Sequence, residues 1–247
     1  MLRRLLVLLF ASAKADEYVN MLVLQRMTDV RTEEADCDAG SWFGNSATNN
    51  ENRCWLGDDW KAVAATGLAA IEHFNNRDGT YVPEFATLGS CDKKISATVV
   101  DSVSMGTPSV KALLTQISAG TTPDAIIGPS RSAACMPSAT LAGVEDIPQI
   151  SYWATSAKLD SLDDYPRFMR VIPTDDAVAF AVCQFWAVDM GYTVAAMIHS
   201  NDGYGEAYKE SIVNHCLSAG VVVSIFSYDA SDKDAIASQV VALAATV

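Results

Sequence analysis

The feature of this sequence that most constrains its fold is a regular alternation of short apolar runs with segments of helical periodicity. Strands separated by helices indicate β-α-β units, because parallel neighbours need a long crossover connection. The expected strands are residues 18–24, 95–101, 125–128, 147–152, 168–172, 194–199 and 221–227. The expected helices are residues 58–74, 109–119, a segment ending near 143, 175–190, 206–219 and 233–245. We therefore predict an α/β fold with parallel sheets and helices on both faces.

The alternation divides into two lobes. Residues 16–160 form the expected first lobe, in which 32–52 is a predicted loop because it is rich in Gly, Ser and Asn and has no period. Residues 161–247 form the expected hinge and second lobe. That lobe reaches only two or three strands before Val247, too few to bury both faces of a parallel sheet. We therefore expect the second lobe to be incomplete and the sequence to be part of a longer product.

The first 15 residues have the pattern of a secretory signal peptide. Arg3 and Arg4 precede an apolar run, and Ala13-Lys14-Ala15 offers a cleavage site between small residues. The apolar run is much shorter than the roughly 20 residues that cross a bilayer. We predict that residues 1–15 are removed and that the mature chain is secreted or extracellular. Any membrane anchor is expected to lie outside this chain.

The charge of the chain argues against some partners. The whole sequence has 17 basic and 30 acidic residues, a net charge of −13. Removal of residues 1–15 leaves 14 basic residues and a net charge of −16. A nucleic-acid partner is therefore not expected, because phosphate binding requires a basic face. The sequence also has no nucleophile elbow, glycine-rich phosphate loop or zinc-protease motif, so we expect no enzyme, cofactor or metal.

Six cysteines, an even number, together with a signal peptide favour disulfides over a zinc cluster, since none lies in a C-x-x-C motif. Cys54 and Cys91 bracket one helical segment and are the first predicted pair. Cys183 and Cys216, on helices expected to face each other, are the second. Cys135 lies inside a helical pattern, and a buried free thiol is an equally good interpretation.

Hydroxyl groups follow two neighbouring strands. The strand at 125–128 leads through Gly-Pro into a segment with Ser132, and the strand at 147–152 leads to Thr155. Ligands of open α/β sheets bind beyond the carboxyl ends of the strands, where connections diverge. We therefore expect a small polar pocket at this edge.

These segments, taken in order, resemble the type I periplasmic-binding-protein superfamily, and in particular the receptor-type ligand-binding region of class C G-protein-coupled receptors and receptor guanylate cyclases. The matching sequences are AAIEHFN at 69–75, IGPS at 127–130, IPQISY at 147–152, ATS at 154–156, FMRVIP at 168–173 followed by Asp175, and DGYG at 202–205. The resemblance implies a two-lobed, Venus-flytrap fold with the ligand in the cleft between the lobes.

The resemblance also implies a set of ligand-binding residues. In the metabotropic-glutamate-like branch, positions matching Ser132, Thr155, Asp175 and Tyr204 hold an α-amino acid. A helix start with a hydroxyl suits the ligand carboxylate, and the Asp175 carboxylate suits its ammonium. Trp153 departs from the pattern because it replaces a Ser, and it narrows the pocket or stacks on the ligand.

Arg131 also departs from the pattern and is expected beside the pocket, paired with a ligand acid group or with Asp175. Each site residue has a structural alternative. Ser132 and Thr155 suit a helix cap and a turn, and Asp175 suits the N-cap of the next helix. Trp153 suits the core, and Tyr204 an exposed turn.

We therefore expect the extracellular ligand-binding region of a membrane receptor, which closes on a small, amino-acid-like ligand. The resemblance further implies a homodimer formed through the first-lobe helices at 58–74 and 109–119. The alternatives are a soluble solute-binding protein of an amino-acid transporter and a non-binding ectodomain.

Overall fold

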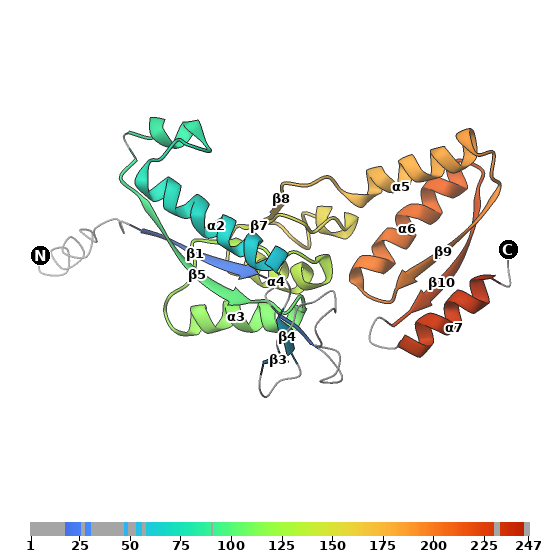
Figure 1. Cartoon of the computed structure of the whole chain (residues 1–247), viewed down its shortest axis with the longest axis horizontal. Helices are drawn as coiled ribbons and strands as arrows, with labels where there is room; N and C mark the ends of the chain where they lie inside the picture. The colour runs from blue at the N-terminus through green and yellow to red at the C-terminus, as the bar shows by residue number, and fades with distance from the viewer. Residues whose placement is uncertain are drawn as a thin grey trace, which may run out of the picture.

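The computed structural model describes residues 18–25, 28–30, 47–48, 53–55, 58–89, 91–229 and 233–244. The expected signal peptide lies outside these residues. Figure 1 shows two groups of elements joined by the segment that follows β8. We call the elements up to β8 the N-terminal unit and those from α5 onward the C-terminal unit. The predicted domain boundary at residue 160 remains a prediction, and β8 belongs to the N-terminal sheet.

The N-terminal unit is built on a five-stranded parallel sheet of order β5-β1-β6-β7-β8. Its strands are β1 (Tyr18–Gln25), β5 (Lys94–Asp101), β6 (Ala125–Ile127), β7 (Gln149–Ser151) and β8 (Phe168–Arg170). The first strand in the chain lies between the second and the third, so the strand order reverses beside β1. In a doubly wound sheet this reversal places a crevice at the carboxyl ends of the strands.

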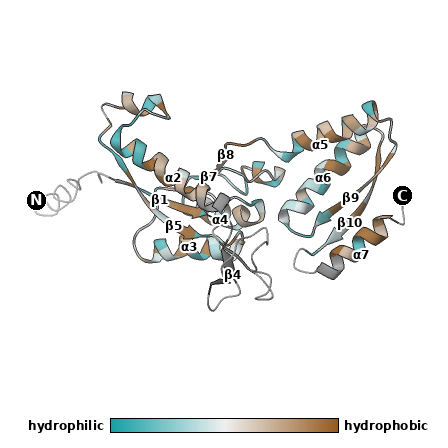
Figure 2. Ribbon diagram, in the orientation of Figure 1, coloured by the Kyte–Doolittle hydropathy of each residue, from teal (hydrophilic) through white to brown (hydrophobic). Residues whose placement is uncertain are grey.

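Three helices connect these strands: α2 (Asp58–Asn76), α3 (Gly106–Ser118) and α4 (Ser132–Val144). Figure 1 shows α2 on one side of the sheet and α3 on the other, as right-handed crossovers in opposite directions require. The main core lies between the sheet and the α3–α4 pair. Its fully buried members include Leu22, Leu24, Leu113 and Ile126. Figure 2 shows the corresponding hydrophobic colouring of β1.

The turn after β6 requires glycine. Gly128 has a φ of +87°, and a Cβ atom there would lie 2.2 Å from the carbonyl oxygen of Leu24 at the end of β1. The peptide bond to Pro129 is cis. This close approach of two strand ends brings the start of α4 to the carboxyl edge of the sheet.

A small antiparallel sheet was not predicted. It consists of β2 (Thr28–Val30), β3 (Ala47–Thr48) and β4 (Arg53–Trp55), in the order β2-β4-β3. The strand β3 lies within the predicted loop at 32–52, so that prediction is wrong at these two residues. A two-residue strand has no hydrophobic period by which the sequence could reveal it.

The C-terminal unit begins with α5 (Asp175–Gln184), which continues as the π-helix η4 (Phe185–Asp189). Its parallel strands β9 (Val194–Ser200) and β10 (Val222–Tyr228) are connected by α6 (Gly203–Ser218), and α7 (Lys233–Ala244) follows. A disulfide between Cys183 and Cys216 joins α5 to α6, which confirms the second predicted pair. Among the described helices, none has the length and apolar character needed to cross a membrane.

The predicted disulfide between Cys54 and Cys91 is not formed, because Cys91 is a free cysteine. Cys54 lies in β4, just before α2, whereas the carbonyl of Cys91 accepts a hydrogen bond from Arg77, just after α2. The 19 residues of α2 place its two ends about 28 Å apart at 1.5 Å per residue. Cys54 and Cys91 therefore lie near opposite ends of α2, too far apart to form a disulfide.

Cys135 is the buried free thiol that the sequence left as an alternative. Its side chain is 0% exposed, and the thiol donates to the carbonyl of Pro129. Burial raises the pKa of the Cys135 thiol to about 12. Cys135 is therefore a packing residue of α4, since the reactive thiolate form is suppressed.

Candidate functional site

The two hydroxyl-bearing loops meet at the carboxyl edge of the N-terminal sheet. Ser132, the first residue of α4, is 3% exposed, and its Oγ accepts a hydrogen bond of 3.1 Å from the backbone N–H of Ser156. Thr155 precedes Ser156, so it lies beside the start of α4. A serine hydroxyl that accepts one bond can still donate its own hydrogen. The first turn of α4 adds backbone N–H groups and the positive end of the helix dipole.

Asp175 faces Thr155 through two hydrogen bonds. The Thr155 hydroxyl donates to Asp175 Oδ2 over 2.6 Å, and the Asp175 N–H donates to the Thr155 carbonyl over 2.9 Å. The N-cap of α5 is Thr174, whose hydroxyl accepts from the N–H of Asp176. The alternative that Asp175 is the N-cap is therefore wrong. Its carboxylate points instead to the loop after β7.

Tyr204 approaches the same carboxylate from the C-terminal unit. Burial raises the pKa of the Tyr204 phenol, and the negative charge of Asp175 raises it further. Burial and Asp175 also raise the pKa of Tyr208. The two tyrosine rings are nearly parallel, at 8°, with centroids 6.2 Å apart. Two π faces and a carboxylate thus lie close together, which is an arrangement that attracts a cation.

The structure places the two departures from the family pattern at the surface. Trp153 is 59% exposed, which is inconsistent with the alternative that it belongs to the core. Arg131 pairs with Asp202 rather than with Asp175, with Arg131 Nη2 3.1 Å from Asp202 Oδ2. Asp202 is the N-cap of α6 and accepts the N–H groups of Tyr204 and Gly205.

A cavity of about 460 Å³ adjoins Tyr204 within the C-terminal unit. It lies between β9 and α6, and Tyr204, Tyr208, Trp186 and His199 are among the residues that line it. His199 is 5% exposed, with its Nδ1 3.0 Å from the Ser200 carbonyl oxygen. Side chains of this kind form an apolar wall with a few polar groups, as small-molecule pockets do.

Two residues of this region, Tyr208 and Asp202, were not predicted from the sequence as site residues. Tyr208 follows Tyr204 by one helical turn, and the i, i+4 spacing could have placed both rings on one face. Asp202 was recognised only as part of the DGYG sequence at 202–205. Its contact with Arg131, 71 positions earlier, has no local signal.

The arrangement is suited to binding a zwitterion. Ser132 and the start of α4 offer donors to an anion, while Asp175 and the two tyrosine rings offer partners to a cation. These groups come from both units.

The fold and this edge site define a periplasmic-binding-protein-like ligand-binding region: a parallel sheet flanked by helices, followed by further α/β elements. Residues 68–246 match the family described as receptor family ligand binding region, and the chain belongs to that family.

Curated relatives are class C receptors. The chain is 34% identical over 100 residues to G-protein coupled receptor family C group 6 member A of Carassius auratus. It is 30% identical over 99 residues to metabotropic glutamate receptor-like protein E of Dictyostelium discoideum, and 32% identical over 98 residues to metabotropic glutamate receptor 6 of Oryctolagus cuniculus. Each match covers 40% of this chain and 11% to 12% of the relative. The chain thus matches only a small part of the length of each of these relatives.

Proposed function

We propose that this chain forms part of the extracellular ligand-binding region of a membrane receptor and that its ligand is an α-amino acid. The observation that supports this best is the convergence of Thr155, Asp175 and Tyr204, which come from both units. A carboxylate with an adjacent hydroxyl and an aromatic face is suited to an ammonium group. Binding rather than catalysis is proposed, since the relatives are receptors.

Each site residue has a role in this proposal. Ser132 and the N–H groups of α4 bind the ligand carboxylate, whereas Thr155 and Asp175 bind the ammonium. Tyr204 covers the ligand when the two units close. Trp153 forms an exposed rim of the site. A ligand then shifts the open–closed equilibrium only as far as it prefers the closed form.

Arg131 lies at the edge of the site, held by Asp202. Residues 1–15 direct the chain to the secretory pathway in this proposal, which accords with the location of a receptor ligand-binding region. A receptor accounts better for the named relatives than a transporter's solute-binding protein does.

The first test is a thermal-shift panel of L-amino acids on the purified chain. A ligand at 100 times its Kd stabilises the folded state by about 2.7 kcal/mol. For a chain of this length that free energy raises Tm by about 5–10 °C. We expect at least one member of the panel to do so, with glycerol and acetate as controls. A panel in which no amino acid raises Tm would contradict the proposal.

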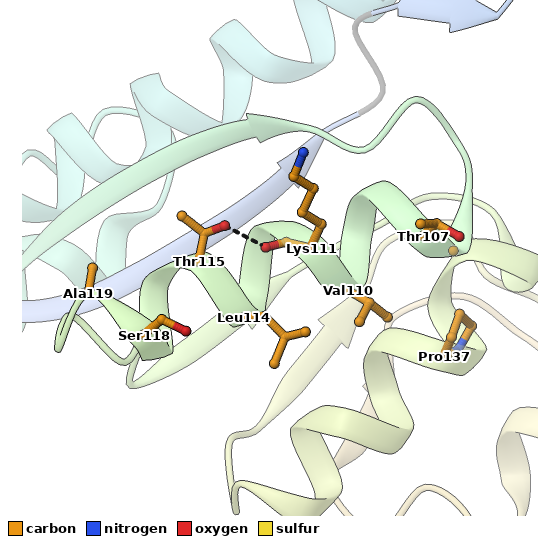
Figure 3. Close-up of a pocket in the computed structure, with 9 residues that line it drawn as sticks. Thr107, Val110, Lys111, Leu114, Thr115, Ser118, Ala119 and Pro137 are labelled. Carbon is orange, nitrogen blue, oxygen red and sulfur yellow. Dashed lines mark hydrogen bonds between the residues drawn. The ribbon is translucent and has the colours of Figure 1, made fainter.

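We also propose a homodimer through α2 and α3. Leu68 on α2 and Leu114 on α3 are 46% and 45% exposed. A groove of about 940 Å³ runs along α3 beside Pro137 of α4. Figure 3 shows Val110 and Leu114 on the same side of α3, facing this groove.

Sedimentation equilibrium tests the dimer. Leu114→Asp places a charge in an apolar contact, and we expect it to weaken self-association at least tenfold. Leu217→Asp is the matched control, because Leu217 is 69% exposed but lies on α6 of the C-terminal unit. A wild-type chain that is monomeric at all concentrations, or equal effects of the two substitutions, would contradict this interface.

A further inference from the structure

The N-termini of two helices from different units are joined by one ion pair. Arg131 is the N-cap residue of α4, and Asp202 is the N-cap residue of α6. Arg131 Nη2 lies 3.1 Å from Asp202 Oδ2, and the side chains are 43% and 25% exposed. This contact spans the gap between the N-terminal and C-terminal units.

The carboxylate of Asp202 is oriented before it meets Arg131. Its Oδ1 accepts the N–H groups of Tyr204 and Gly205 at 2.9 and 2.8 Å, while Oδ2 faces the guanidinium. The capping bonds have already fixed one partner, so the pair loses less side-chain entropy than two free surface side chains would. We therefore expect this ion pair to be more stable than a surface ion pair between two free side chains.

A second ion pair also joins the two units, but its charged atoms are farther apart. Lys158 Nζ of the N-terminal unit lies 3.7 Å from Glu210 Oε1 on α6, with side chains 44% and 57% exposed. In both pairs the cation belongs to the N-terminal unit and the acid to the C-terminal unit, at the N-cap of α6 or on α6 itself. Only the Arg131 pair combines hydrogen-bond distance with a fixed carboxylate.

We propose that the Arg131–Asp202 pair is a latch that stabilises the closed arrangement of the two units. The inference deepens the proposed function, because it identifies a contact that regulates closure of that site. Opening the cleft must separate the guanidinium from the carboxylate and return both to water. The pair thus biases the open–closed equilibrium toward the closed form without touching the ligand-binding groups Thr155 and Asp175.

The test measures the distance between the units in the absence of any amino acid. Dyes on non-canonical residues at the exposed positions Thr140 of α4 and Leu217 of α6 report closure by single-molecule energy transfer. Arg131→Gln removes the cation. Asp202→Asn removes the charge but keeps an N-cap acceptor, since Asn caps as well as Asp. Lys158→Gln is the matched control.

We expect Arg131→Gln and Asp202→Asn each to raise the ratio of open to closed molecules about 1.5- to 5-fold at low salt. The double variant should change it no more than either single one, because both remove the same contact. The difference from wild type should vanish near 1 M salt, where charges are screened within about 3 Å. Lys158→Gln should have a smaller effect.

An unchanged ratio in both single variants, additive effects in the double variant, or an equal effect of Lys158→Gln would overturn the latch. Failure of the latch is distinguishable from failure of the proposed function. The distance measurement contains no amino acid, and the thermal-shift panel does not measure distance.

Discussion

Asp175→Asn should reduce the affinity for an amino-acid ligand by at least about 30-fold. The substitution removes the negative charge opposite the ligand ammonium, and truncating one partner of a close charge pair costs about 2–5 kcal/mol. The fold should persist, because the new amide oxygen can still accept the hydrogen bond from Thr155. Isothermal titration with the amino acid that gives the largest thermal shift measures the change.

Asp176→Asn is the matched control for this prediction. Asp176 is the next residue of α5, but its Oδ1 lies 3.1 Å from His215 Nε2 rather than beside Thr155. The hydrogen bond to His215 lowers the pKa of Asp176, so this carboxylate has a structural partner of its own. We expect its substitution to leave ligand affinity within about twofold. Equal losses in both variants would show that the effect is not specific to Asp175.

Replacing both Cys183 and Cys216 by Ala should lower the free energy of unfolding by about 3–4 kcal/mol. The disulfide closes a chain segment with a sequence separation of 33, and a loop of that length accounts for this loss in the chain-entropy description. Both cysteines are 0% exposed in the core between α5 and α6. Urea denaturation should show the decrease as a lower midpoint.

Cys91→Ala provides the control for the disulfide prediction. Cys91 is a partly buried free thiol in the N-terminal unit, and we expect its replacement to change the free energy of unfolding by less than about 1 kcal/mol. A double variant at Cys183 and Cys216 that loses no more than Cys91→Ala does would contradict the prediction.

The sequence predicted the regular elements well because each has a strong local signal. The apolar run at 18–24 and the helical spacing at 58–74 correspond to β1 and α2 nearly residue for residue. Elements without a period were missed: the two-residue strand β3, the 3-10 helix η2 (Pro83–Thr87) and the 3-10 helix η3 (Ala157–Asp160). Elements of two to five residues are too short to show a hydrophobic period, so the spacing of apolar residues does not reveal them.

The candidate site was less accessible to sequence reasoning. Ser132 and Thr155 could be placed together, since both follow neighbouring parallel strands. The partner of Arg131 could not, because its choice between Asp175 and Asp202 depends on how the two units approach each other. The error at Cys91 has a different cause: order along the chain suggested that Cys54 and Cys91 are close, but the length of α2 separates them.

The central claim is that one ligand is held by its carboxylate at α4 and by its ammonium at Asp175. Its most direct test is isothermal titration of the wild-type chain with the best amino acid, its deaminated acid and its decarboxylated amine. Hydrogen bonds to charged groups contribute about 1.5–3 kcal/mol, so each half-ligand should bind at least tenfold more weakly than the amino acid. Half-ligands that bind as tightly as the intact amino acid would contradict the claim.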